Sequence, residues 1–312
     1  MTTDTAFPLV ETPTRPPLPY HRLALASEST SRWWRPLASG GTALGLYLAG
    51  GVVVVVLFAV ATVLFPTAFS LSESLDDPRS PADMLFLLGS LALMLPAVIL
   101  GSRWGGGMRG SIHSVAGRVR WGLLLRAAAV IVPLYAVVHV VTFAVSPPAD
   151  LVWPPLDART LLVLAIVLLL TPLQCAAEEY AFRALPQQML GTWLKSPVWG
   201  IVLPVPFFVL GHGYDWVGQV DLAVFSLCMG YLVYTSGGVE LAVVVHTANN
   251  LVLFALAPLS ASSLQQGSVP PSALLVSLPL MLVVTAGLSL WVSRQAPPTS
   301  RPRVSPLISS RS

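Results

Sequence analysis

The sequence predicts an all-α fold, a polytopic transmembrane helical bundle of about eight spans with both termini in the cytoplasm. Three observations support this prediction. Hydrophobic residues make up 54% of the 312 residues and charged residues only 10%, whereas roughly a quarter of a soluble domain is charged. The mean hydropathy is +0.74. Several apolar stretches approach or exceed the roughly 20 residues that a helix needs to cross a bilayer.

The apolar stretches predict eight spans joined by short connections. Residues 1–41 and 295–312 are polar and rich in proline, which predicts two disordered cytoplasmic tails on either side of a transmembrane bundle at 42–294. We find no signal-peptide cleavage site and no internal repeat. The expected spans are 42–66, 83–101, 121–145, 160–182, 198–214, 219–236, 239–257 and 272–293.

The connections alternate in charge, and this alternation predicts the orientation. Both tails and the second and fourth connections are rich in arginine, whereas the first, third and fifth are acidic or poor in basic residues. Because cytoplasmic loops carry the excess of arginine and lysine, both tails are expected inside. The sequence pI near 9.1 comes from these membrane-flanking residues, so we expect the lipid bilayer and not nucleic acid as a partner.

Four other residues in the expected spans are interpreted as structural. Cys175 and Cys228 both fall inside spans and form no C-x-x-C motif, which argues against a disulfide or a cysteine metal site. We expect His139 to be a packing residue whose replacement leaves activity unchanged. Arg126 is expected to extend its charge to the cytoplasmic face.

Charged residues stand directly behind an apolar run in the stretch TPLQCAAEEYAFRALP, residues 171–186. Ionisable groups in a membrane cost roughly 2.5–3.5 kcal/mol each on insertion scales, so each needs a reason. Glu179 and Arg183 are four residues apart and share a helix face, which predicts an ion pair. Glu178 has no such partner, because Phe182 is at its i+4 position, and an unpaired buried carboxylate is typical of a general base. The alternative is that these charges merely mark the helix end.

Two further spans present polar side chains at helical spacing. PFFVLGH places Phe208 and His212 on one face, and HTANN places His246 and Asn250 on one face with Asn249 beside them. A lone histidine in a span is more often a packing or hydrogen-bonding residue than a ligand. A glutamate, two histidines and an asparagine from three spans could instead form a water-activating site, with or without a metal.

Together these motifs resemble the CPBP family of intramembrane proteases. That family includes the type II CAAX prenyl endopeptidases and bacterial Abi-like proteins linked to bacteriocin processing and self-immunity. Glu-Glu-x-x-x-Arg in EEYAFR, Phe-x-x-x-His in FVLGH and His-x-x-x-Asn in HTANN match it in order and spacing. The resemblance covers roughly 160–257, the expected protease core. One departure is Ala184, because the family often has glycine after the arginine.

The resemblance implies a role for each residue of the first motif. Glu178 would activate the attacking water. Glu179 and Arg183 would hold the helix and orient the site, with Phe208 of the second motif in a supporting position.

The resemblance also implies roles for the other two motifs. His212 would help to bind the water or a metal, and His246 and Asn250 would complete the site, with Asn250 suited to donate to a developing oxyanion. The family is conventionally classed as metallo-, and Glu178, His212 and His246 could hold Zn²⁺. A glutamate-activated water needs no metal, and the residues alone leave both versions open.

The expected depths of these residues are not equal. Glu178 would lie near the cytoplasmic end of its span and His246 about 10 Å in from that side, whereas His212 would lie roughly 20 Å in. Pro204 and Pro206 would kink an ordinary helix. We therefore expect the connection at 186–200 to enter the bilayer, or the fifth span to start late.

The function predicted is an intramembrane endopeptidase that hydrolyses a peptide bond of a membrane-associated peptide or protein. The alternatives are a proton-coupled transporter or channel and a non-catalytic immunity or assembly partner. The near absence of lysine, with Lys195 alone, and the abundance of alanine, glycine and arginine suggest a GC-rich bacterial genome. We therefore expect a multi-pass protein of a bacterial cytoplasmic membrane, where prenylated CAAX proteins are generally lacking.

Overall fold

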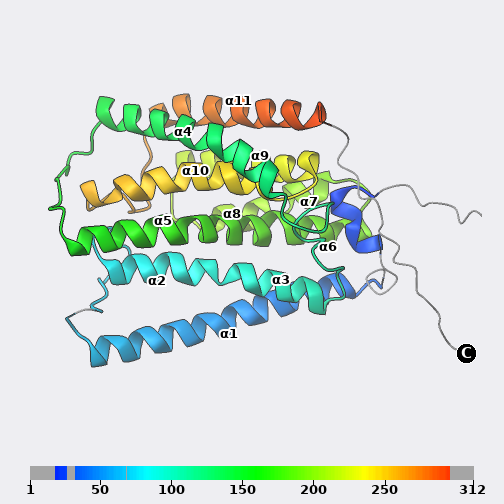
Figure 1. The fold of residues 1–312 in the computed structure, drawn as a ribbon, viewed down its shortest axis with the longest axis horizontal. Coiled ribbons are helices and arrows are strands. Elements are labelled where there is room, and N and C mark those ends of the chain that lie inside the picture. The colour runs from blue at the N-terminus through cyan, green and yellow to red at the C-terminus, as the bar shows by residue number, and fades with distance from the viewer. Residues whose placement is uncertain (1–17, 27–31, 68, 296–312) are drawn as a thin grey trace, which may run out of the picture.

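The computed structural model describes residues 18–26, 32–67 and 69–295. In these residues the regular elements are all helices and no β-strand forms, which confirms the all-α prediction. The long helices lie side by side along one axis, so the molecule is a bundle with two ends (Figure 1). Seven helical segments of the described chain are long and apolar enough to cross a membrane. The protein is a multi-pass membrane protein.

The helices follow the expected spans closely, apart from the fifth. The membrane-length segments are α1, α2 with α3, α4, α5 with α6, α9, α10, and α11. The bounds in chain order are η1 Tyr20–Ala26, α1 Arg35–Leu64, α2 Pro81–Ala92, α3 Met94–Trp104, α4 Trp121–Val145, α5 Ala158–Glu179, η2 Tyr180–Ala184, α6 Leu185–Trp193, α7 Val198–Val202, α8 Val205–Leu210, α9 Trp216–Ser236, α10 Glu240–Leu256, η3 Ala257–Leu259, η4 Pro271–Ala273 and α11 Leu274–Ser293.

The fifth expected span is a broken apolar helix that is shorter than a membrane-length span. The apolar helical segment runs only from Val198 to Leu210 and is interrupted between α7 and α8, where Pro204 precedes α8. A proline lacks the N–H that a helix interior needs, so the chain cannot continue as one regular helix here. After α8 the chain continues without a helix to Asp215, whose N–H donates to the carbonyl of Gly267 in the connection between α10 and α11 (2.9 Å).

The connections gather at two ends, as the charge alternation predicts (Figure 1). At the basic end, Ser114 between α3 and α4 pairs with Gly238 between α9 and α10. At the acidic end, Leu151 between α4 and α5 pairs with Ser260 after α10. The start of η1 and the C-terminal end of α11 both lie at the basic end (Figure 1). That this end faces the cytoplasm remains a prediction from charge.

Acidic and hydroxyl side chains at the acidic end cap the helices that begin there. The carboxylate of Asp157 accepts from Thr160 N at the start of α5 (2.8 Å). Asp215 accepts from two backbone N–H groups at the start of α9 (3.1 Å each), and Ser80 accepts from Asp83 N at the start of α2 (3.2 Å). The first N–H groups of a helix lack internal partners, so these side chains have a structural reason to lie at this end.

Part of the expected N-terminal tail is ordered, which differs from the prediction. Tyr20 and Leu23 of η1 are buried, and the Tyr20 hydroxyl donates to the carbonyl of Ile112 (2.7 Å). The apolar residues of this short segment cover the basic end, where they pack against α6, and Arg35 already begins α1. Residues 1–17 and 27–31 and nearly all of the C-terminal tail, 296–312, lie outside the described residues.

Helix α1 is the most exposed of the membrane-length helices and packs mainly on α3. The contact depends on Gly101, where an added Cβ would lie 2.7 Å from the Cβ of Ala43 and from the carbonyl oxygen of Ser39. Small residues let membrane helices approach closely enough for dispersion contacts along their backbones. Helix α10, in contrast, is central and packs on α4, α5 and α9. This position places the HTANN motif in the middle of the bundle.

Candidate active site

The first motif lies where α5 changes its helical geometry. Glu178 and Glu179 are the last residues of α5, and Tyr180–Ala184 form a π-helical turn, η2, before α6. π turns are rare and occur frequently at functional sites. Both carboxylates are buried, with 6% of Glu178 and none of Glu179 exposed. The turn therefore holds two adjacent acids inside the bundle, on the side of the basic end.

Glu179 and Arg183 form the ion pair that their spacing predicts. Arg183 Nη1 lies 3.2 Å from Glu179 Oε1, and both side chains are almost completely buried. The guanidinium also lies over two aromatic rings, 4.1 Å from the centroid of Phe208 and 5.6 Å from that of Phe225. Cation–π attraction of this kind is worth about 2 kcal/mol when the groups are desolvated. Phe208 thus supports the site by covering the buried cation.

His246 joins the second acid of α5 to the third motif. Its Nδ1 lies 2.8 Å from Glu179 Oε1, and its Nε2 lies 3.2 Å from Asn250 Nδ2. An amide nitrogen can only donate, so Nε2 accepts, and the proton of the neutral ring is on Nδ1, where it is donated to Glu179. The carboxylate therefore fixes both the tautomer and the orientation of His246.

The expected packing residue His139 is part of this network, which corrects the sequence-based interpretation. His139 Nε2 lies 3.1 Å from Asn249 Oδ1, and Asn249 Nδ2 donates to Asn250 Oδ1 (3.0 Å). Neither Asn249 nor His139 was expected to act in the site. The signal was hidden because His139 is on α4, 110 residues before its partner.

Glu178 is the acid without a permanent cationic partner. Among the described residues it forms no ion pair with an arginine or lysine, and His246 Nε2 lies 3.5 Å from its Oε2. The phenol of Tyr47 on α1 is close enough to interact electrostatically with Glu178. The buried carboxylate thus lies against the end of His246 that also contacts the Asn250 amide.

His212 lies beside this network and is not joined to it by a hydrogen bond in the described part of the chain. Its Nδ1 donates to the carbonyl of Phe208 (2.9 Å), so the acceptor of the neutral ring is Nε2. Ring contacts lead from His212 to Phe208 (4.9 Å), from Phe208 to Phe225 (6.0 Å) and from Phe225 to His246 (4.9 Å). The structure brings together Glu178, Glu179, Arg183, His246 and Asn250, with His212 behind two phenylalanine rings.

The side chains as placed do not offer the expected three-ligand zinc set. In the described residues no group of three or more His, Cys, Asp or Glu side chains is arranged to hold a metal ion. Both ring nitrogens of His246 already have partners, Glu179 and Asn250.

The cysteines have the structural environment expected of them, and the expected position of Arg126 at the cytoplasmic face remains a prediction. Cys175 and Cys228 are buried and free, and Cys175 shares its buried position with Gln174, to which its thiol donates (3.3 Å). Arg126 is exposed and lies 5.8 Å from the ring of Trp291.

A second ion pair, between the partly exposed Arg120 and the buried Glu240, lies at the basic end and was not revealed by sequence spacing. Arg120 Nη2 lies 2.6 Å from Glu240 Oε2. The Nε and backbone N–H of Arg120 both donate to Glu240 Oε1 (2.9 and 2.8 Å). The connection before Arg120 also reaches the π turn, where His113 Nδ1 hydrogen-bonds with the Tyr180 hydroxyl. Burial lowers the pKa of His113, so this ring is neutral at pH 7.

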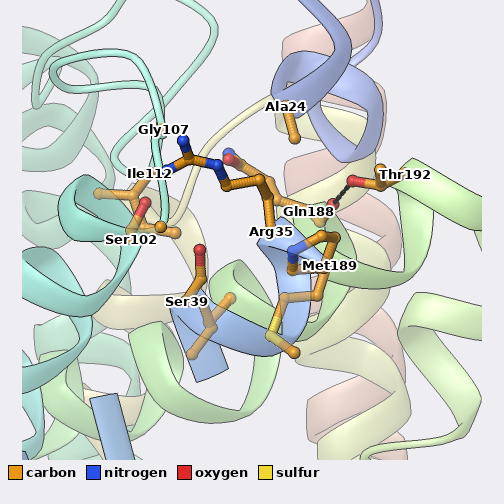
Figure 2. A pocket seen from close by; sticks show the side chains of 12 residues that line it. Ala24, Arg35, Ser39, Ser102, Gly107, Ile112, Gln188, Met189 and Thr192 are labelled. Carbon is orange, nitrogen blue, oxygen red and sulfur yellow. Dashed lines mark hydrogen bonds between the residues drawn. The ribbon is translucent and has the colours of Figure 1, made fainter. Parts of the chain in front are cut away.

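A separate pocket opens at the basic end between η1, α1, α3 and α6 (Figure 2). Arg35 extends across it toward Gly107 and Ile112 (Figure 2). The side chains of the three motifs do not line it. The lining residues are Ala24, Arg35, Pro36, Ser39, Ser102, Gly105, Gly107, Ile112, Leu185, Gln188, Met189 and Thr192.

Fold and site together define a multi-pass membrane protein with an acid-rich polar site inside its helical bundle. Residues 157–252 match the family model described as type II CAAX prenyl endopeptidase Rce1-like. The match contains all three motifs and confirms, over this region, the resemblance inferred from them. A Bacillus subtilis (strain 168) protein, the uncharacterized protein YyaK, is 23% identical over 239 residues, which cover 72% of this chain and 78% of that protein. No solved structure matches the chain significantly.

Proposed function

We propose that the protein is an intramembrane endopeptidase that cleaves a membrane-associated peptide or protein with a glutamate-activated water. The observation that carries the proposal is the placement of Glu178 beside His246, which Asn250 also contacts, with no arginine or lysine paired to Glu178 among the described residues. The similarity of residues 157–252 to type II CAAX prenyl endopeptidases supports the same class of reaction.

In the proposed reaction, Glu178 takes a proton from water while the water oxygen attacks the carbonyl carbon of the scissile peptide bond. The carbonyl oxygen becomes an oxyanion. Asn250 has two amide protons, one of which is donated to His246, so the other is available to stabilise this oxyanion. The protonated Glu178 then gives its proton to the leaving amine nitrogen as the carbon–nitrogen bond breaks.

The neighbouring charges would keep this base functional. Arg183 is paired with Glu179 and not with Glu178. The guanidinium therefore offsets the negative charge of Glu179, while the Glu178 carboxylate remains a proton acceptor. His246 accepts from the Asn250 amide through Nε2 and is anchored by Glu179 through Nδ1. Glu179 would therefore orient the site, and Glu178 would perform the proton transfer.

The proposed substrate is a peptide segment at or within the bilayer, and the proposed location is a bacterial cytoplasmic membrane. The basic end would face the cytoplasm. Single cysteines near Asp76 or Asp150 should then react with a membrane-impermeant reagent from outside, and a cysteine near Arg109 should not. External labelling of the cysteine near Arg109 would show that the orientation is the opposite of the one proposed.

The decisive experiment compares the wild type with Glu178→Gln in a cleavage assay with quenched peptides and a bacterial membrane proteome. The amide keeps the shape of the side chain and removes its basicity, so cleavage should fall by about 10²- to 10⁴-fold while the folded yield stays near that of the wild type. Glu73→Gln, the same change at an exposed connection residue, is the matched control and should cleave normally. Equal cleavage by Glu178→Gln and the wild type would remove Glu178 from the mechanism.

Two further arms examine zinc and His212. Activity lost on chelation and restored by Zn²⁺ would select a metal-dependent version of the reaction, and activity that survives chelation would select the metal-free one. His212→Gln should lower cleavage if the free ring nitrogen binds water or metal. A protein that cleaves no peptide but carries protons into liposomes would instead be a transporter.

A further inference from the structure

The hydrogen bonds around Asn250 run in one direction across the bundle. Asn249 Oδ1 can only accept, so His139 Nε2 donates to it. Asn249 Nδ2 donates to Asn250 Oδ1, and Asn250 Nδ2 donates to His246 Nε2. The series therefore has a donor at His139 on α4 and ends, through His246, at the Glu179 carboxylate on α5.

Each member of this series fixes the orientation of the next. An asparagine amide can rotate by half a turn and exchange its oxygen and nitrogen with little change in shape. The donor from His139 holds the oxygen of Asn249 toward α4, which turns its nitrogen toward Asn250. Asn250 must then point its oxygen at Asn249 and its nitrogen at His246. Without the first donor, both amides could turn, and the oxygen of Asn250 would repel a developing oxyanion.

The surroundings of His139 suit a fixed donor. Its ring lies 5.9 Å from the ring of Tyr135, one turn earlier on α4. Hydrogen bonds in a low-dielectric interior polarise their neighbours, so a complete series is worth more than its separate members. Burying a polar side chain in a membrane span costs free energy, and a side chain that only filled space would gain no hydrogen bond to offset this cost.

We propose that His139 is a positioning residue that sets the direction of the Asn250 amide through Asn249. This inference rests on the proposed function for its effect on cleavage. The network itself can be measured without activity. His139 hydrogen-bonds to Asn249 and acts through it on Asn250, the oxyanion donor two residues away in the series.

The first test replaces the donor while it keeps the ring. His139→Phe should lower kcat about tenfold, the effect of losing one hydrogen bond, and leave KM unchanged. His139→Gln should restore most of kcat, because a glutamine amide nitrogen can donate from nearly the same position. Tyr135→Phe is the matched control, since it alters the same face of α4 and leaves the bond to Asn249 intact; it should have wild-type kcat.

The second test asks whether His139 acts through the asparagines. Added to Asn250→Ala, the His139→Phe change should lower kcat no further, because the group that it orients is already gone. A residue that only supports the fold would instead lower activity by the same factor in both backgrounds. Additive effects, or a wild-type kcat for His139→Phe, would overturn the proposal.

The third test is independent of proteolysis and distinguishes failure of this inference from failure of the proposed function. In protein labelled with ¹⁵N-histidine, the wild-type His246 signals should report a neutral ring with its proton on Nδ1 and an acceptor at Nε2. His139→Phe should shift the His246 Nε2 resonance, His139→Gln should largely return it, and Tyr135→Phe should leave it in place. An unchanged His246 resonance in His139→Phe would contradict the proposal even if the wild type cleaves no peptide.

Discussion

The bundle contains two glutamate–arginine pairs, each with a buried glutamate, that balance its charge differently. At the basic end, Glu240 receives hydrogen bonds from the Nε, Nη2 and backbone N–H of Arg120, while Arg120 Nη1 donates to the carbonyl of Ser236 (2.8 Å). In the interior, Arg183 lies 3.2 Å from Glu179, yet none of its guanidinium nitrogens has a hydrogen-bond partner in the described residues.

The difference indicates what each pair is for. Both oxygens of the Glu240 carboxylate accept hydrogen bonds from Arg120, at 2.6 to 2.9 Å. This pair ties the start of α4 to the start of α10. Glu179 shares one oxygen between Arg183 and His246, and Arg183 is covered by phenylalanine rings in place of hydrogen-bond acceptors. A saturated pair is suited to structure, and an unsaturated pair beside an unpaired acid is suited to a site in which charge must move.

The largest effect is expected when the interior pair is broken. Arg183→Ala leaves Glu179 buried without its cation, so it should lower the free energy of unfolding by about 3–5 kcal/mol and abolish cleavage. Folded yield and thermal unfolding in detergent measure the first effect, and the peptide assay measures the second.

The double variant Glu179→Gln with Arg183→Gln is the control for this prediction. It removes both charges, so folding should partly recover while activity stays low. A double variant that folds less well than Arg183→Ala would show that the two residues do not stabilise one another.

Breaking the pair at the basic end should separate stability from catalysis. Arg120→Ala should lower the free energy of unfolding by about 3 kcal/mol, because Glu240 stays buried and keeps only the backbone N–H as a partner. The molecules that remain folded should cleave peptide at a rate near that of the wild type. Unfolding temperature and activity per folded molecule are the measurements, and a loss of activity as severe as that of Arg183→Ala would erase the distinction between the pairs.

A smaller effect is expected from the rings that cover Arg183. Phe208→Leu should lower the free energy of unfolding by roughly 2 kcal/mol, because it removes the aromatic face over the cation and part of the buried area. Phe207→Leu is the matched control, since Phe207 is 72% exposed and should be nearly neutral. Similar unfolding temperatures for the two variants would show that the cation–π contact contributes little.

The smallest effect concerns Asp150, a partly exposed acid whose hydrogen-bond partners are uncharged. Hydrogen bonds from the Ser260 hydroxyl and the Ser262 N–H lower the pKa of Asp150 from 3.8 to about 2. Because the pKa of Asp150 is lower in the folded state, the carboxylate stabilises the protein at pH values above its ordinary pKa of 3.8. This stabilisation disappears as the pH falls toward about 2. The gap in unfolding temperature between the wild type and Asp150→Asn should therefore be small at pH 7 and close under acid. A gap that widens below about pH 4 would reverse the assigned direction.

Local spacing in the sequence was sufficient for the contacts within one helix. Glu179 and Arg183 are one turn apart, and so are His246 and Asn250, so helical periodicity alone predicts that each pair meets. The apolar runs likewise predict the long helices, and the two prolines predict that the fifth crossing is irregular.

Contacts between distant segments could not be predicted in this way. The Arg120–Glu240 pair and the His139–Asn249 bond each depend on how separate helices are packed, and no periodic pattern links their residues. The burial of η1 was missed for a different reason. Its few apolar residues lie among prolines and polar residues, so composition indicated a tail, whereas the open basic end supplied a surface for Tyr20 and Leu23 to cover.

The π turn at Tyr180–Ala184 affects how this chain is aligned with its relatives. Its i to i+5 hydrogen bonding accommodates about one residue more than an α-helical turn, so it behaves like a single-residue insertion that the helix has absorbed without breaking. Each added residue rotates the remainder of the helix by about 100°. Gln187 and Gln188 of α6 donate to the carbonyls of Gly230 and Ser111 (2.8 and 2.7 Å). The π turn therefore changes the angle between the face of α6 that carries them and the face of α5 that carries the two acids. One helical wheel drawn across 158–193 would mix these faces, and a relative that lacks one residue here would lose either its acids or its α6 contacts.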